Sequence, residues 1–413
     1  MKLHTLAAAV AAVSAAVPAL AMDLGNGLTF KGFGTVGVMH SSNQDADFVA
    51  SNFRQGTGAG RSDETSFKVD SKVGGQLDWQ ASDRLSMSVQ ALSKQYEDKT
   101  WVPRIESAFV KFKALQSLDV RVGRVSPPVY MLSDYINVNY ANPWVRPPSE
   151  HYGVVPFSNI DGMDLLWRPT TGSVSWLVQP YVGRTKVDFA GGNSDAENKV
   201  SGISITASRG DLSLRTGYLI DKVHFGGSSI DTLIGAYSAL CAIDPVACGL
   251  AHDLNNDITA KYLSFGATWD PGNYFVSGEW AQLKFDSDTS QNAHSWYITS
   301  GYRLDKWTPY VSYSKFKIDS SAIYTGSGNA TTNAITTAGR MGYTGQGQHT
   351  ISLGVRYDVM PNVALKAQWD HVKTDCNDGL AGSCGGRFIN QSNNFANSSQ
   401  KADLLSLSVD FVF

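Results

Sequence analysis

The last nine residues constrain the fold of this chain more than any other segment. In residues 405–413 apolar side chains take every second position, and Ser406, Ser408 and Asp410 lie between them. Side chains of a β-strand alternate between its two faces, so this segment predicts a strand with one apolar and one polar face. Such a strand, ending on the aromatic Phe413, fits a wall between lipid and water.

Strands of this kind recur along the chain. Apolar and polar residues alternate in segments near 28–38, 67–79, 85–90, 110–113, 118–122, 212–215, 263–269, 351–357 and 365–370. The longest runs have about the 9–14 residues that a tilted membrane strand needs. After residue 21 there is no run of about 18 apolar residues that would predict a transmembrane helix. We also find no long stretch with the helical period of 3.6 residues.

Short and long connections alternate between these strands. Tight turns are predicted at 81–84, 115–117, 169–172, 209–211, 270–273, 304–306 and 360–362, and longer polar connections lie between them. A compact soluble domain would rarely carry so many long loops. Aromatic residues lie close to the tight turns, as in an interfacial girdle: Trp79, Phe112, Trp167, Trp269, Trp307 and Tyr357. The pattern predicts one all-β domain over residues 22–413, a closed 16-stranded antiparallel transmembrane β-barrel with both termini on the turn side.

The N-terminus indicates export. Lys2, an apolar run and the small residues before Met22 predict a signal peptide over residues 1–21. A membrane-anchor helix is the alternative, and the apolar run is short for a span. Export permits disulfides, and the four cysteines form two close pairs, Cys241 with Cys248 and Cys376 with Cys384. Four cysteines allow three pairings, of which we expect the two local ones, as staples within loops.

Composition and motifs disfavour several classes of function. A formal net charge of −3 argues against nucleic acid as a partner. No G-x-S-x-G or H-E-x-x-H motif occurs and no catalytic triad or paired-acid site is readable, so we expect neither an enzyme nor a nucleotide, metal or organic cofactor. An adhesin would not need inward-facing charges. A channel for hydrophobic solutes is disfavoured by a polar lumen.

The connection over residues 125–160 differs from the other loops. It is rich in aromatic and aliphatic side chains, and six prolines lie between Pro127 and Pro156. Proline fixes φ and stiffens the chain. A stiff, partly apolar loop should pack against a surface, and inside a barrel that surface is the lumen wall. We therefore expect this third outer loop to fold inward.

The chain resembles the Gram-negative trimeric porins, with general diffusion porins as the nearest type. The resemblance rests on the signal peptide, residues 30–34 of the first strand, residues 104–110 leading to 122–124, the third loop and the terminal Phe413. It implies a homotrimer in outer-membrane lipid. It also implies a water-filled channel for passive diffusion of small hydrophilic solutes and ions. In that family the third loop narrows the pore, and its acidic groups face a basic cluster on the wall.

Carried over to this sequence, the resemblance predicts the residues of the constriction. By strand parity the basic residues Lys68, Lys72, Lys111 and Arg121 point inward, whereas the direction of Arg124 depends on how its strand ends; Asp134, Glu150 and Asp161 supply the acidic groups. More basic than acidic groups at this height predict a weak preference for anions. Replacing Lys72 and Arg121 by glutamate should then shift the channel towards cations. The family's wall cluster is usually richer in arginine and its loop less aromatic, which keeps a substrate-selective channel for small organic solutes as the alternative.

Overall fold

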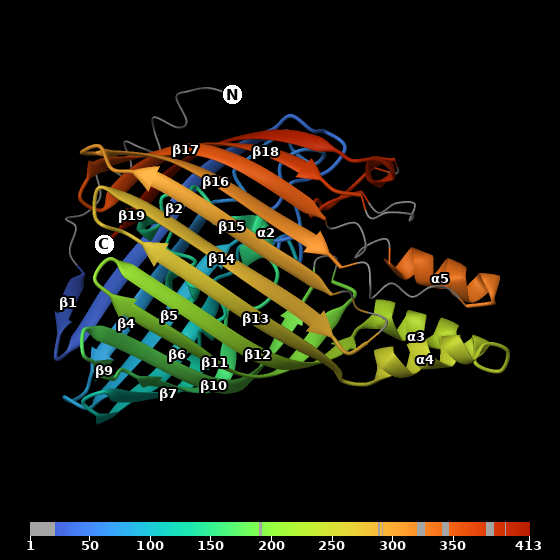
Figure 1. Ribbon diagram of the computed structural model, residues 1–413, viewed down its shortest axis with the longest axis horizontal. Coiled ribbons are helices and arrows are strands. Elements are labelled where there is room, and N and C mark those ends of the chain that lie inside the picture. Colours follow the sequence, from blue (N-terminus) through green and yellow to red (C-terminus); the bar gives the residue numbers. More distant parts are fainter. Residues whose placement is uncertain are drawn as a thin grey trace.

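Hydrogen bonds between the last strand and the first long strand close the sheet into a barrel (Figure 1). The structure is a computed structural model that describes residues 21–189, 192–287, 290, 292–319, 327–340, 347–376, 384–392 and 394–413. The predicted signal peptide lies almost wholly outside this range. The described residues form one antiparallel sheet of nineteen strands, of which β1 (Met22–Gly25), β3 (Thr65–Ser66) and β9 (Thr170–Thr171) have only two to four residues. The other sixteen form the wall, as the sequence predicts.

The wall strands follow one another around the barrel in chain order. They are β2 (Leu28–Ser41), β4 (Lys72–Gln80), β5 (Leu85–Lys94), β6 (Arg104–Leu115), β7 (Leu118–Val125), β8 (Ile160–Trp167), β10 (Val174–Asp188), β11 (Asp195–Arg209), β12 (Leu212–Gly226), β13 (Ile258–Trp269), β14 (Tyr274–Phe285), β15 (Ala293–Tyr302), β16 (Trp307–Ile318), β17 (Gln348–Met360), β18 (Val363–Thr374) and β19 (Lys401–Val412). The seven predicted tight turns all lie between paired strands, at one end of the barrel. Closure pairs the backbone groups of every wall strand, which lipid cannot do.

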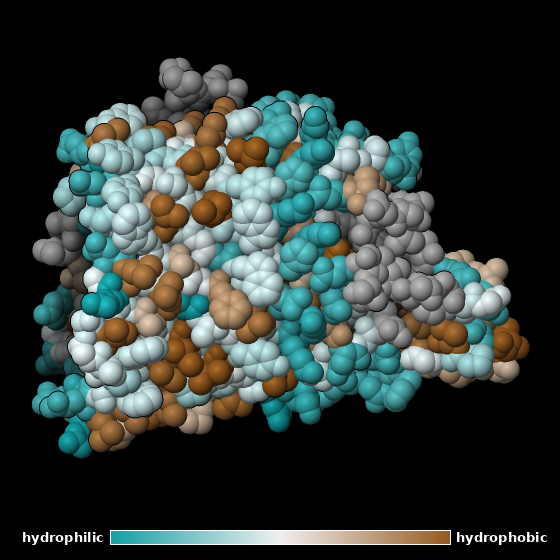
Figure 2. Space-filling model, in the orientation of Figure 1, coloured by the Kyte–Doolittle hydropathy of each residue, from teal (hydrophilic) through white to brown (hydrophobic). Residues whose placement is uncertain are grey.

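The outer surface of the barrel has two zones. Apolar side chains face outward over the part of the strands next to the turns, and a polar belt crosses the strands nearer the loops (Figure 2). On β12 the exposed Leu212 and Leu214 lie near the turn, whereas Lys222 is the exposed residue near the loop end. The strands therefore extend beyond the apolar band, and their loop ends stand in water.

Two outer connections besides the third loop contain α-helices that the sequence analysis did not predict. These are α3 (Ser228–Leu240) and α4 (Pro245–Asn255) after β12, and α5 (Ala330–Arg340) after β16 (Figure 1). Apolar residues of α3 and α4 form a small core of their own around Tyr237 and Leu250. The helices have 11 to 13 residues, so the helical period extends over too few residues to stand out in a chain of strands. No helix in the described part of the chain has the length and apolarity to cross a membrane.

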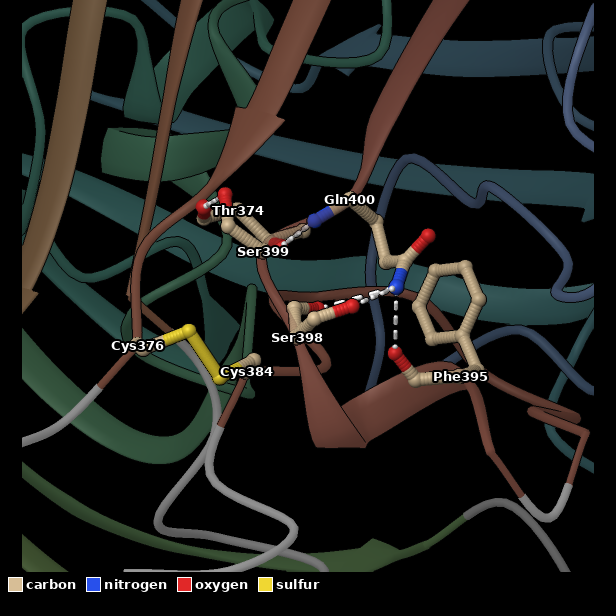
Figure 3. The surroundings of a disulfide bond; sticks show 7 residues. All are labelled: Thr374, Cys376, Cys384, Phe395, Ser398, Ser399 and Gln400. Atoms are coloured by element: carbon tan, nitrogen blue, oxygen red, sulfur yellow. Dashed lines mark hydrogen bonds between the residues drawn. A yellow bond between two sulfur atoms is a disulfide. The ribbon is translucent and has the colours of Figure 1, made fainter. Parts of the chain in front are cut away.

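Both predicted disulfides are confirmed. Cys241–Cys248 joins the end of α3 to α4, and Cys376–Cys384 lies at the base of the connection between β18 and β19. Figure 3 shows the second disulfide beside polar contacts of Gln400, the residue before β19. The backbone N–H of Gln400 donates to Thr374 Oγ1 at 2.8 Å, and its side-chain Nε2 donates to the Phe395 carbonyl at 2.9 Å. Each bond therefore closes a segment outside the wall.

Reducing both disulfides should loosen the outer loops and leave the barrel folded. On the loop-entropy model each bond contributes about 2–3 kcal/mol locally, whereas the wall is held by strand ladders that contain no cysteine. Far-UV circular dichroism after reduction should keep its β-sheet signal, while limited proteolysis should cut faster near residues 241–248 and 376–384. Loss of the β-sheet signal on reduction would contradict this prediction.

Candidate functional site: the third loop and the lumen wall

The third loop connects β7 to β8 and lies against inward-facing side chains of the wall. It contains the short helices η1 (Ser133–Tyr135), η2 (Asn139–Ala141) and α2 (Ser149–Tyr152). α2 contacts β14 to β17, and η2 contacts β2 and β19. Figure 1 shows α2 within the outline of the barrel. The loop thus crosses from its own strands to the opposite side of the wall.

Arg146 ties the loop to β18, to β19 and to the turn before β4. Its guanidinium donates to both carboxylate oxygens of Asp70 at 2.8 Å, to Asp370 Oδ2 at 2.6 Å, and to Ser406 Oγ. The side chain is only 6% exposed. A buried charge needs such partners, because removing it from water is costly. Arg146 together with Asp70 and Asp370, called here the Arg146 clamp, fixes where the loop crosses the lumen.

Lys366 and Gln368 of β18 bind the backbone of the same loop. Lys366 Nζ donates to the carbonyls of Asn139 at 2.7 Å and Trp144 at 2.9 Å, and pairs with Asp410 at 2.8 Å. Gln368 Oε1 accepts from the Val145 amide at 2.9 Å. Loops lack the internal hydrogen bonds of helices and strands, so these wall groups satisfy backbone atoms that would otherwise be buried alone.

A third set of contacts holds α2. Glu279 of β14 accepts from the Met131 amide at 2.9 Å and from the hydroxyls of Tyr152 and Tyr297. Glu150 accepts from Ser314 at 2.7 Å, from Gln348 Nε2 at 2.6 Å and from Thr350. Glu150 is 2% exposed and lies inside this contact. The expectation that it faces the basic wall across the lumen is therefore wrong, because its lone pairs are used to hold the loop.

The opposite wall carries the basic side chains. Lys111 of β6 and Arg121 of β7 are directly paired in the ladder, as are Lys72 of β4 and Lys94 of β5. Arg121 donates Nε to Asp164 Oδ1 at 2.8 Å in a two-pronged ion pair. Lys72, Lys94 and Lys111 form no ion pair with any residue that the structure describes. These three lysines therefore have no acidic partner in direct contact among the described residues, while Asp70 and Asp410 lie within electrostatic range of Lys72, and Glu106 within range of Lys94.

The tip of the third loop approaches this basic wall. Asn137 lies 3.5 Å from Lys94 Nζ and donates to Glu106 Oε1 at 3.3 Å. Asp134 is exposed and lies within electrostatic range of Arg121. The side of the lumen bounded by this tip and by β4 to β7 is the candidate passage. Its walls carry both signs of charge, which is suited to passing small hydrated ions and polar solutes.

Comparison with known proteins identifies the family. The family model of the Gram-negative porins matches residues 5–377. The chain is a Gram-negative porin. It is therefore an outer-membrane channel with a multi-pass β-barrel, and the family and fold indicate a channel and not an enzyme. No curated protein matches the sequence.

Solved structures share the fold at low sequence identity. The anion-selective porin from Comamonas acidovorans is 14% identical with a TM-score of 0.54, covering 94% of this chain and 99% of that one. OmpF of Salmonella typhi, solved with daunomycin, is 13% identical with a TM-score of 0.54, covering 95% and 100%. The trimer form of OmpT of Vibrio cholerae is 12% identical with a TM-score of 0.52, covering 94% and 99%. At these identities the likeness concerns the fold alone.

Three further predicted residues of this porin lie away from the passage. Arg124 and Asp161 form an ion pair, with Nε 2.7 Å from Oδ1, on the same face as the exposed Val122 and Met163, so they point outward. The parity of the strand decides this, since Arg124 is three positions from the inward Arg121. Lys68 pairs with Asp63 of its own outer connection at 2.8 Å, and both side chains are 44% exposed. These placements correct the sequence-based set.

The sequence analysis also missed residues that shape the porin's site. They are Lys94, Arg146, Glu279 and Lys366. Lys366 alternates with the outward Leu365 and Trp369, so parity alone could have placed it in the lumen. Arg146 could not be found in this way, because a loop has no fixed side-chain period.

Proposed function

We propose that this porin forms a water-filled passage for passive diffusion of small hydrophilic solutes and ions, with a weak preference for anions. The observation that carries the proposal is the set of lysines Lys72, Lys94 and Lys111 on β4 to β6, none of which forms an ion pair with a described residue, with Lys94 in contact with the loop tip. A low-dielectric wall focuses the field of such charges into the passage. Charges on distant loops act less, since the Debye length is about 8 Å in physiological salt.

Charge reversal on the wall should test this preference. The variant Lys72→Glu/Lys111→Glu should move the reversal potential in a salt gradient towards cation selectivity. The structure makes Lys111 a better choice than Arg121, because a glutamate at 121 would stand against Asp164 and disturb folding. Planar-bilayer recordings of the purified porin provide the measurement.

A matched control separates the local effect from net charge. Lys222→Glu/Lys261→Glu makes the same change of net charge, but both lysines are exposed and point outward on β12 and β13. This variant should keep the parent's reversal potential. Equal shifts in the two double variants, or none in the first, would refute the assignment of Lys72 and Lys111 to the passage.

The same proposal includes a homotrimer in outer-membrane lipid. On the outward face where β19 meets β2, the rings of Phe411 and Phe413 stack 6.5 Å apart and cover the positions of Gly34 and Gly32. A smooth apolar and aromatic surface of this kind suits contact with a second copy as well as with lipid. Light scattering in mild detergent should give three times the mass of one chain. A monomeric mass with full channel activity would count against the trimer.

A further inference from the structure

The outer half of the lumen contains an apolar cavity that a diffusion channel does not need. It lies between the third loop and strands β11 to β16, under α3 and α4, with a volume of about 210 Å³. Its lining includes Val155, Leu219, Phe225, Tyr262, Leu283 and Phe316. The porin's lumen is therefore polar at the loop tip but apolar on this side. The polar lumen that strand alternation predicts does not extend to this side.

Three buried polar atoms at this cavity have no hydrogen-bond partner among the described residues. They are Arg387 Nη1, Tyr262 Oη and Asp221 Oδ1. The three residues are 4%, 1% and 5% exposed. Buried polar atoms are nearly always paired, so each such exception calls for a specific explanation. Three of them on the lining of one apolar cavity indicate a ligand that supplies the missing partners.

Arg387 is held in a fixed position at the edge of the cavity. Its Nη2 donates to Asn52 Oδ1 at 2.7 Å and to the Gly153 carbonyl at 2.6 Å. The guanidinium carbon lies 4.7 Å above the ring of Phe316. These contacts use both N–H groups of Nη2 and one face of the guanidinium, and they leave Nη1 for another acceptor. The group forms no ion pair with a residue in the described ranges, and burial lowers its pKa only to about 10, so it is charged at neutral pH.

We propose that this cavity binds a small organic acid with an apolar body of about the size of one aromatic ring, whose carboxylate pairs with Arg387. An apolar cavity of about 150 Å³ in another protein holds benzene, so the volume here accommodates a ring and a carboxylate. Arginine is the preferred partner of carboxylates, since its planar donors match both oxygens. Asp221 and Tyr262 remain available for a hydroxyl group on the ring, and Asp221 disfavours a second carboxylate.

Binding of benzoate to the purified porin in detergent tests this inference. Isothermal titration calorimetry should give saturable binding of benzoate and much weaker binding of benzyl alcohol, which keeps the ring and lacks the carboxylate. Acetate, which lacks the ring, should also bind weakly. Saturable binding of benzyl alcohol with the affinity of benzoate would mean a purely apolar cavity and would overturn the proposal. No benzoate binding at about 10 mM, where even a weak site of about 1 mM would be filled, would overturn it as well.

Two variants that should weaken benzoate binding in different ways test whether the cavity is the binding site. Arg387→Gln removes the charge and should weaken benzoate binding about tenfold or more, since a charge-assisted hydrogen bond contributes at least that factor. Ala260→Phe fills the cavity opposite Phe285 and should abolish binding with Arg387 intact. Arg303→Gln, which removes an arginine at a turn, is the control and should bind as the parent does.

The readout keeps this inference separate from the proposed diffusion function. Calorimetry measures binding without conduction, so a channel that conducts without selectivity can still bind benzoate, and an anion-preferring channel can fail to bind it. Each variant should retain the β-sheet signal in circular dichroism. If folded Arg387→Gln and folded Ala260→Phe both bind benzoate with the parent's affinity, the cavity is not the site.

Discussion

Replacing Arg146 by leucine should widen the passage and destabilise the porin together. The substitution removes the cation of the Arg146 clamp and leaves Asp70 and Asp370 buried without a counter-charge. Breaking a buried ion pair from one side costs about 3–5 kcal/mol, because the remaining charges stay desolvated. The third loop also loses its hydrogen bonds to Asp370 of β18 and Ser406 of β19, while the contacts of Lys366 and Gln368 with the loop remain. We therefore expect a larger single-channel conductance and a lower denaturant midpoint of unfolding.

A control variant and a rescue variant test whether loss of the Arg146 clamp causes these changes in conductance and stability. Arg303 pairs with Asp270 at 2.6 Å near a turn, with side chains about 40% exposed, and such surface pairs contribute about 0–1 kcal/mol. Arg303→Leu should therefore leave conductance and stability almost unchanged. Adding Asp70→Asn and Asp370→Asn to Arg146→Leu should recover part of the stability while conductance stays high. If Arg146→Leu keeps the parent's conductance, the clamp does not position the loop.

Strand parity explains which parts of the site the sequence could predict. The sixteen strands and the seven turns follow from alternation and turn residues, both of which are local signals. The same rule predicts that Lys72, Lys111 and Arg121 point inward, and the ladder pairs Lys72 with Lys94 and Lys111 with Arg121. Arg124 has the opposite parity, and the strand continues regularly to Val125, so the rule held to the strand's end.

The loop contacts could not be predicted because they depend on tertiary geometry. Glu150 was expected to face the basic wall, but it is turned to β16 and β17 by α2, a helix of only four residues. Nothing in the spacing of the loop residues indicates that turn. Arg146 likewise finds acids that lie 76 and 224 positions away in the chain.

The sequence does contain a signal for the apolar outer lumen, because the alternation of apolar and polar residues shifts by one position along the strands that line it. Near the turn of β12, Leu212 and Leu214 face lipid, whereas near the loop Val223 and Phe225 face the lumen and Lys222 faces water. Apolar residues thus move from even to odd positions within one strand. Alternation read only over the first half of the strand misses this change. The height at which the phase changes marks where the wall leaves the apolar band, and it is also where the cavity begins.

The second large effect on stability is expected in the wall beside the third loop, where the backbones of neighbouring strands lie very close together. Gly123, Gly162 and Gly183 are paired in register across β7, β8 and β10. A Cβ on Gly162 would lie 2.5 Å from the Cα of Gly183 and closer still to the Val182 carbonyl oxygen. Both contacts are with backbone atoms, which cannot rotate away as a side chain can. The ladder at this point therefore requires glycine.

Gly162→Ala should separate β8 from β10 and lower the free energy of unfolding by about 3 kcal/mol, the upper range for overpacking, because the backbone itself must shift. Gly217→Ala on β12 is the matched control. It also adds one inward-facing methyl group to a wall strand, but the nearest atoms belong to the side chains of Ser264 and Arg215, at 2.9 Å and 3.6 Å, which can adjust. Guanidinium unfolding followed by circular dichroism should show a clear loss of stability for Gly162→Ala and a small one for Gly217→Ala. If the variant stays stable but β8 is displaced, the third loop, which ends where β8 begins, should move with it. This displacement should appear as an altered single-channel conductance. Parent-like stability and conductance in Gly162→Ala would show that these strands tolerate a wider spacing than the structure has.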